Sequence, residues 1–240
     1  MTAPVTRSSY RPPEIPLLAN GDHLDRLEFE RRYNAMPEVK KAELIEGVVY
    51  MPSPVRHRHH SSPHFDLITW LGLYRIATPG VEGADNGSLR LDMENEPQPD
   101  AFLIVLPSHG GKVVIDEDDY ITGGPEFVAE VSASTVSIDL KAKKRAYCRN
   151  GVLEYVVWRV EDGEIDWFIL RAGEYHRLPG DAAGIYRSAV LPGLWLDPAA
   201  LVNGDLPAVS RVVQQGLASP EHAAFAAKLQ QAASSPPSPA

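Results

Sequence analysis

Apolar residues alternate along this chain between helical spacing and short continuous runs. Residues 23–37 place apolar side chains at helical spacing and end at Pro37, which predicts a helix that stops there. Two short apolar segments then flank Glu46-Gly47, a turn signal that predicts a β-hairpin. A second helix is expected from about Pro63, because proline is tolerated in a first helical turn.

The second half of the chain is richer in predicted strands. Gly151 ends a lysine-rich helix predicted over residues 140–150, because glycine is a common helix stop. Apolar runs bounded by turn residues predict strands at 88–92, 101–106, 127–131, 155–160, 164–170 and 174–178. This mixed order of helices and strands predicts an α/β fold, with one sheet that carries helices on its faces.

Composition divides the chain into three parts. Residues 1–21 are rich in proline, serine and threonine and are expected to form a flexible arm. Residues 22–202 hold the globular pattern, and residues 203–240 are expected to form a helical or disordered tail. The single cysteine, Cys148, excludes an internal disulfide and a cysteine-based zinc cluster. We see no signal peptide and no membrane span, which is the pattern of a cytoplasmic protein.

Two acids interrupt the apolar runs. Asp100 follows Pro99 and directly precedes a buried strand, where a turn or capping role is the simple alternative. Glu130 lies inside the apolar run of residues 127–131. Charged groups are rarely buried unless they are paired or bind a metal. Glu130 therefore predicts either a metal ligand or a structural salt bridge.

The helix after this run offers a lysine to the same site. Lys143 shares a helical face with Leu140 and Tyr147, the face expected to meet the sheet. Lys144 is the competing candidate, because it shares a stripe with Leu140 and Cys148. Two carboxylates suit a divalent ion such as Mg²⁺ or Mn²⁺, which takes oxygen ligands and activates water. A lysine beside them would stabilise the developing charge.

At these residues the sequence resembles the PD-(D/E)XK nuclease superfamily, in particular its putative restriction endonuclease family. The similarity runs from about residue 43 to residue 196 and is carried by AELIEGVVYMPSP, His59, Pro99-Asp100, EVSASTVSIDLKAKKRAY and GVLEYVVW. It implies a restriction-endonuclease-like fold, with a central mixed β-sheet flanked by helices. It also implies that Asp100 and Glu130 bind the metal.

One position departs from the superfamily pattern. The lysine of the E-x-K motif would fall at residue 132, which is Ser132 in this chain. In the family that the sequence resembles, the lysine comes from the following helix, and its spacing indicates Lys143. The resemblance also matches Glu43 to an acid before the first hairpin, which would complete the site. An exposed charge at the end of a strand is the alternative for Glu43.

A histidine-rich run at residues 56–60 is the remaining candidate. Paired ligand spacing typical of zinc is absent from the sequence, so we interpret His59 and Arg56 as contacts to nucleic-acid phosphates. A solvated loop is the alternative. Tyr147, Tyr155 and Trp158 are expected in the core.

The functional hypothesis is a Mg²⁺-dependent endonuclease that hydrolyses DNA, with Asp100, Glu130, Lys143 and Glu43 as its catalytic residues. A catalytically silent module with the same fold, which binds nucleic acid or protein, is the alternative. The net charge of −9 favours this alternative, because bulk electrostatics would not draw the chain to DNA. A phosphoesterase acting on a small molecule through the histidine run is a weaker third option. A homodimer is compatible with cutting two strands, although no feature of the sequence requires it.

Overall fold

Six strands form the central sheet of the computed structural model, which describes residues 15–51 and 57–234. Their order is β11-β10-β9-β8-β5-β3. β8 and β9 pair in parallel, and the other neighbours pair antiparallel. The strands are β3 (Val81–Ala84), β5 (Ala101–Val105), β8 (Phe127–Ser132), β9 (Glu154–Arg159), β10 (Glu164–Arg171) and β11 (Glu174–Arg177).

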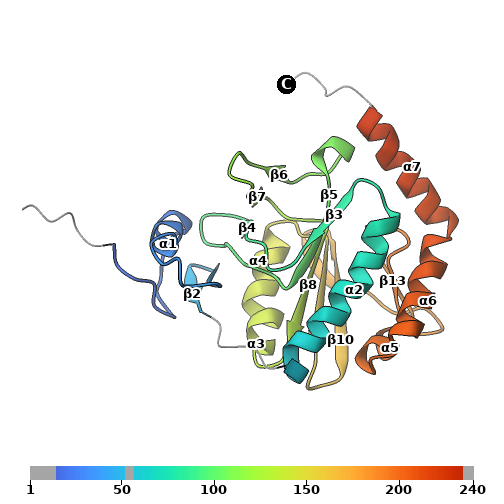
Figure 1. Cartoon of the computed structure of the whole chain (residues 1–240), viewed down its shortest axis with the longest axis horizontal. Helices are drawn as coiled ribbons and strands as arrows, with labels where there is room; N and C mark the ends of the chain where they lie inside the picture. The colour runs from blue at the N-terminus through green and yellow to red at the C-terminus, as the bar shows by residue number, and fades with distance from the viewer. Residues whose placement is uncertain (1–14, 52–56, 235–240) are drawn as a thin grey trace, which may run out of the picture.

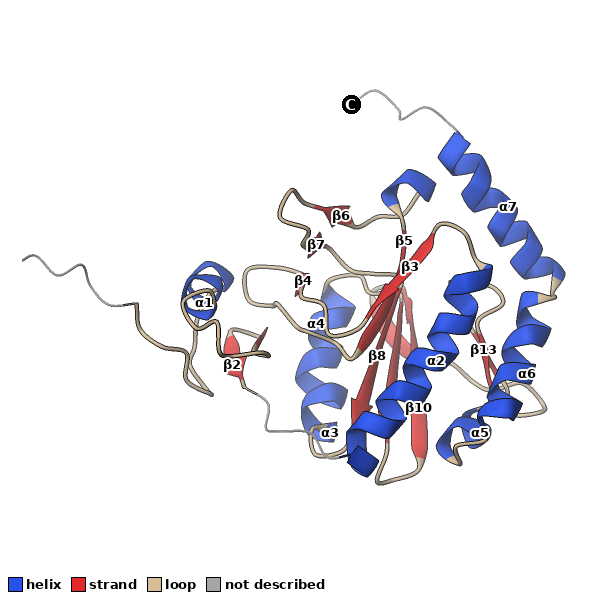
Figure 2. Ribbon diagram, viewed as in Figure 1, coloured by secondary structure: helices blue, strands red, loops and turns tan. Residues whose placement is uncertain are grey.

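Alternate side chains of these strands enter two different cores, because successive residues of a strand point to opposite faces. On one face Leu103 and Ala129 pack with the helices α2 (Ser62–Ala77) and α6 (Leu206–Leu217). On the other face Phe102 and Val128 pack with Tyr147 of α4 (Lys144–Arg149). Figures 1 and 2 show the sheet between these two helical layers. The predicted α/β class, with a central mixed sheet flanked by helices, is confirmed.

The helices of the two layers come from different parts of the chain. One layer holds α2 (Ser62–Ala77), α5 (Pro198–Val202), α6 (Leu206–Leu217) and α7 (Pro220–Ser234). The other holds α3 (Val136–Ile138), the π-helical turn η3 (Asp139–Lys143) and α4 (Lys144–Arg149). This second layer connects β8 to its parallel neighbour β9.

The first part of the described chain has a small core of its own. It contains α1 (Arg26–Tyr33), β1 (Glu43–Ile45) and β2 (Val48–Tyr50). The predicted hairpin forms between β1 and β2, with positive φ at both Glu46 and Gly47, as a tight hairpin turn requires. Phe29, Leu44 and Val49 are fully buried in this small core.

Several short strands and a turn lie outside the six-stranded sheet. The strand predicted at 88–92 is only β4 (Leu89–Arg90), because the Asp92 carboxylate accepts hydrogen bonds from Glu94 N and Asn95 Nδ2 and so forms a turn. The other short elements are the 3₁₀ turn η2 (Pro107–His109), β6 (Val114–Ile115), β7 (Ile121–Thr122), β12 (Tyr186–Arg187) and β13 (Trp195–Leu196).

The segment after residue 203, expected as a helical or disordered tail, contributes to the main core. Val209 and Val213 of α6 and Leu229 of α7 are buried in the same cluster as the sheet residues. Apolar positions at helical spacing along α6 produce this packing. None of the described helices combines the length and apolar character needed to cross a membrane.

Candidate active site

Asp100, directly before β5, lies beside Glu130 of the neighbouring antiparallel strand β8. Ala101 of β5 pairs with Ala129 of β8, so the same register carried one residue further sets Asp100 opposite Glu130. Both side chains are almost fully buried, with 3% of each residue exposed. The backbone N–H of Asp100 points to Glu130 Oε2 at 3.4 Å, and the Val131 N–H donates to Asp100 Oδ2 at 2.8 Å. The two predicted metal ligands therefore face one place.

Lys143 joins this pair from the helical layer that holds η3 and α4. Its Nζ lies 2.9 Å from Glu130 Oε1 and 2.8 Å from Glu43 Oε1. It occupies the last position of η3, a wide π turn, and such turns are frequent at functional sites. Lys144 instead lies over the ring of Phe168, with its Nζ 3.5 Å from the ring centroid. Between the two candidate lysines, the geometry selects Lys143.

Glu43 reaches the same place from β1. Its Oε1 accepts a hydrogen bond from the backbone N–H of Gln98 at 2.8 Å in addition to the contact with Lys143. Glu43 is buried, so the exposed strand-end alternative does not describe it. The structure thus brings together the four side chains that the sequence proposed as catalytic: those of Glu43, Asp100, Glu130 and Lys143.

Ser132 and Asp139 form a support behind Lys143. Asp139 Oδ2 accepts hydrogen bonds of 2.7 Å from both Ser132 Oγ and Thr135 Oγ1. Asp139 Oδ1 lies 3.8 Å from Lys143 Nζ. Ser132, at the position where the resemblance led us to look for a lysine, thus donates its hydroxyl to an acid that lies next to Lys143.

Three basic residues around Asp100 escaped the sequence interpretation. His60 Nε2 lies 3.3 Å from Asp100 Oδ2, and Lys41 Nζ lies 3.6 Å from Asp100 Oδ1. His64 Nε2 lies 2.8 Å from the backbone oxygen of Asp100, and its ring packs against that of His60. The signal in the sequence was the spacing of His60 and His64, which are four residues apart and so share one helical face.

His59, which the sequence proposed as a phosphate contact, pairs with a different group. Its Nδ1 contacts Glu161 Oε1 in the hairpin between β9 and β10. His59 and Glu161 both line the cleft described below. Arg56, the other proposed contact, lies outside the described residues. The histidine-rich run continues as the π-helical turn η1 (His57–Ser61) and leads directly into α2.

Tyr147 and Tyr155 lie in the core, as expected, but one of them also contacts the site. Tyr147 is fully buried, and its hydroxyl donates to Glu130 Oε1 at 2.9 Å. The Tyr155 hydroxyl donates to the backbone oxygen of Asp139 at 3.1 Å. Together these bonds fix the orientation of the Glu130 carboxylate and the position of η3.

Burial and charge set the protonation of the site. Burial raises the pKa of Glu130 to about 8, and the neighbouring carboxylates add to an effect that the Lys143 charge only partly offsets. Burial alone would raise the pKa of Asp100 and lower that of Lys143. The His60 hydrogen bond and the Lys41 charge nevertheless hold the pKa of Asp100 below its ordinary value. The carboxylates of Glu130 and Glu43 raise the pKa of Lys143 well above its ordinary value.

These groups line a cleft of about 1340 Å³ between the small N-terminal core and the sheet. Lys40, Lys41 and Tyr50 lie on one wall, while His59 and His60 come from η1. The described residues contain no group of three or more histidine, cysteine, aspartate or glutamate side chains arranged around a metal position.

The sequence matches the family Uma2, described as "Putative restriction endonuclease", over residues 27–199. The fold is similar to the crystal structure of a putative nuclease belonging to DUF820 from Anabaena variabilis ATCC 29413. That similarity has a TM-score of 0.50 and 10% sequence identity, and it covers 76% of this chain and 97% of the other. No curated protein sequence matches this chain.

Proposed function

Because the chain belongs to the Uma2 family of putative restriction endonucleases, we propose that it is a metal-dependent endonuclease that hydrolyses phosphodiester bonds of DNA. One observation carries the proposal. Two buried carboxylates, Asp100 directly before β5 and Glu130 within β8, converge with the ammonium group of Lys143 in the lining of a wide cleft. Buried charges are uncommon unless they are paired or bind a metal, and a cleft that collects several of them is a candidate functional site.

The charges at the floor of the cleft suit a divalent cation. Four acids, Glu43, Asp100, Glu130 and Asp139, meet the two ammonium groups of Lys41 and Lys143. The four acids outnumber the two lysines by two, which is the charge that one Mg²⁺ or Mn²⁺ carries. The cation would also favour the ionised form of Glu130, whose pKa burial raises.

Asp100 and Glu130 each keep one weakly engaged oxygen for such an ion. Asp100 Oδ1 has only the 3.6 Å contact with Lys41, and Glu130 Oε2 only the 3.4 Å contact with a backbone nitrogen, among the residues that the structure describes. Mg²⁺ is commonly held by one or two carboxylates, with water and substrate oxygens as further ligands. When bound, the ion supplies an activated water and neutralises charge on the phosphate.

Lys143 is suited to donate hydrogen bonds and unsuited to accept a proton. Its raised pKa keeps the ammonium form at neutral pH. Two of its three N–H donors are directed to Glu43 and Glu130. The third faces Asp139 Oδ1 at 3.8 Å, beyond hydrogen-bond distance. A donor with no close partner would serve a water molecule or a phosphate oxygen in the cleft and stabilise negative charge in the transition state.

The histidines would act on Asp100. His60 approaches a carboxylate oxygen and His64 the backbone oxygen of the same residue. His60 and the Val131 N–H thus hold the side chain of Asp100, and His64 holds its backbone. His59, His60 and His64 all line the cleft, so their imidazoles are within the site that would hold a phosphate.

The alternative of a catalytically silent binding module has its own support. The carboxylate of Glu130 is already paired with Lys143 and Tyr147, and that of Asp100 with Lys41 and His60. A structural network of this kind needs no metal. Under this alternative, the same cleft would bind a nucleic-acid strand or a peptide without cutting it.

A cleavage panel separates these functions. Purified protein is incubated with supercoiled plasmid, linear duplex, single-stranded DNA and a small phosphodiester, each with Mg²⁺, with Mn²⁺ or with chelator. We expect metal-dependent cleavage of DNA and little or no turnover of the small phosphodiester. Binding of DNA without cleavage under all conditions would favour the silent module. Turnover of the small substrate alone would favour the phosphoesterase.

A further inference from the structure

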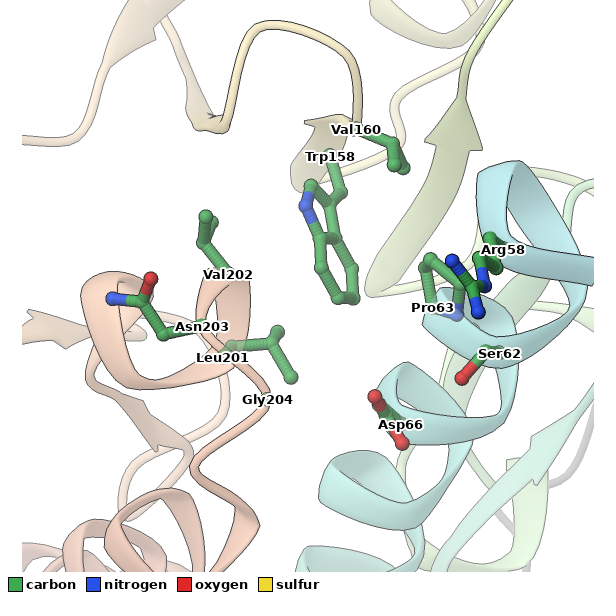
Figure 3. Close-up of a pocket in the computed structure, with 10 residues that line it drawn as sticks. All are labelled: Arg58, Ser62, Pro63, Asp66, Trp158, Val160, Leu201, Val202, Asn203 and Gly204. Carbon is green, nitrogen blue, oxygen red and sulfur yellow. The ribbon is translucent and has the colours of Figure 1, made fainter.

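A second, smaller cavity opens beside the catalytic cleft. It has a volume of about 270 Å³ and lies between α5 and the start of α2. Figure 3 shows Leu201 and Val202 on one side, Pro63 and Asp66 on the other, and the ring of Trp158 between them. This volume is slightly below the range of about 300–1,000 Å³ typical of small-molecule pockets, so it suits one flat ring system.

Only a thin wall separates the cavity from the cleft. Arg58 lines the cavity, whereas the next residue, His59, lines the cleft. In the same way Val160 lines the cavity and the next residue, Glu161, lines the cleft. Consecutive Cα atoms are about 3.8 Å apart, and the contact between His59 and Glu161 forms the ridge. The cleft and the cavity therefore meet at residues 58–59 and 160–161.

Asp66 gives the cavity a specific chemical character. Figure 3 shows this residue on the side of α2 that faces Leu201 across the cavity. Its carboxylate has no hydrogen-bond or ion-pair partner among the described residues, and burial raises its pKa. Leu201, Val202 and Pro63 form apolar walls, and Arg58, Ser62 and Asn203 add polar groups. Asp66 is the one acid among the side chains that line the cavity, so it offers two adjacent acceptor oxygens.

We propose that this cavity binds a guanine base, next to the phosphate that the cleft holds. The inference rests on the proposed action on nucleic acid. Guanine presents N1–H and N2–H side by side, and these two donors match the two oxygens of the Asp66 carboxylate. Adenine and cytosine place a ring acceptor beside their amino group, and thymine places a carbonyl on each side of its N3–H. Unpaired bases are recognised in this way, by their hydrogen-bonding edges and by stacking.

The test measures base preference without cleavage. Fluorescence anisotropy in chelator reports binding of the full chain to labelled oligothymidylates that carry one central guanine, hypoxanthine, adenine or thymine. We expect guanine to bind about tenfold more tightly than thymine, within the range for a bidentate base contact. Hypoxanthine lacks the N2 amino group and should fall between them. Guanosine 5′-monophosphate should likewise compete better than thymidine 5′-monophosphate. The concentration at which it competes tells whether a free nucleotide is enough to occupy the cavity.

Two variants locate the preference. Asp66→Asn should remove the preference for guanine, and Val202→Trp should remove it by filling the cavity. Asp118→Asn makes the same charge change at an exposed residue that lines neither the cavity nor the cleft, and this variant should keep the preference for guanine. Equal binding of all four oligonucleotides to the wild type would overturn the proposal, as would a preference that survives both cavity variants. Cleavage without a guanine preference would refute only this inference, and a preference without cleavage would refute only the nuclease.

Discussion

The carboxylates of Glu43 and Glu130 depend on one buried cation. Lys143 Nζ lies 2.8 Å from the first and 2.9 Å from the second, and 5% of Lys143 is exposed. A lone buried charge is costly, whereas a paired one is tolerated. The arrangement therefore makes Lys143 important for stability as well as for the proposed chemistry.

Removing this cation should destabilise the fold. We expect Lys143→Ala to lower the free energy of unfolding by about 3 kcal/mol, the lower end for breaking a buried ion pair. Lys144→Ala is the matched control, because Lys144 is half-buried over Phe168 and should cost less than about 1 kcal/mol, as expected for a cation–π contact. Urea unfolding monitored by fluorescence measures both values. Equal losses in the two variants would contradict the assigned role.

For individual side chains of the candidate site, the sequence predicted which residues take part better than it predicted which residues they contact. Asp100 and Glu130 could be proposed because acids stand next to or within apolar runs, and Lys143 because of its spacing from Tyr147. His60 could not be assigned, because its contact with Asp100 joins two segments 40 residues apart. The sequence likewise gave no sign of the partner of His59, because its contact with Glu161 joins segments 102 residues apart.

Among the elements, α1 is joined to the loop before β5 through a pair of acids. Glu96 is buried and interacts with Glu30 of α1, which in turn accepts hydrogen bonds from Arg26 and Arg90. Burial and the neighbouring Glu30 raise the pKa of Glu96 to about 8 from 4.5. Around neutral pH the folded protein therefore holds a proton at Glu96 that the unfolded chain releases.

This difference predicts a decline of stability with rising pH. Below pH 4.5 both states keep the Glu96 proton, and above about 8 both states lose it. Between these values the unfolded state binds fewer protons, so the contribution of Glu96 to the free energy of unfolding falls by at most about 1.4 kcal/mol per pH unit. Glu96→Gln donates to Glu30 at every pH and should flatten the decline. Urea unfolding at pH 5, 6, 7 and 8 measures the free energy of unfolding of both proteins. Parallel pH profiles for wild type and variant would refute the role of Glu96.

Elements with strong periodicity were predicted well from the sequence, and elements fixed by distant contacts were not. The buried strands at 101–106 and 127–131 appear as β5 and β8, because continuous apolar runs need cover on both faces. Glu154, which lies in a motif that carries the resemblance to the family, shows what local patterns cannot predict. It accepts hydrogen bonds from Ser188 Oγ and Ala189 N, 34 and 35 residues away, a role that no local pattern reveals.

For the molecule as a whole, the C-terminal helices complete one face of the sheet. Val209, Val213 and Leu229 are buried in the larger core, together with Trp70 and Trp167. A chain that ends at residue 202 would expose this apolar surface to water. Composition alone suggested a tail after residue 203, because alanine- and glutamine-rich segments resemble marginal helices when their packing surface is not known.

A chain truncated after residue 202 should therefore fail to fold cooperatively. As a milder test, Val213→Ala should cost about 2 kcal/mol of unfolding free energy, in the range for exposing or deleting a buried aliphatic side chain. Val212→Ala changes the neighbouring half-buried position and should cost clearly less. Thermal and urea unfolding measure these effects. A cooperative transition in the truncated chain would show that α6 and α7 are dispensable.

The central claim is that Asp100 and Glu130 form a metal-dependent nuclease site. The most direct measurement is the rate of Mg²⁺-dependent nicking of supercoiled plasmid by the wild type, Asp100→Asn, Glu130→Gln and Lys144→Ala, with folding checked by circular dichroism. We predict at least about a 100-fold loss in the two acid variants, the scale on which one catalytic electrostatic contact acts, and an unchanged rate for Lys144→Ala. Wild-type nicking rates in folded Asp100→Asn and Glu130→Gln would contradict the account.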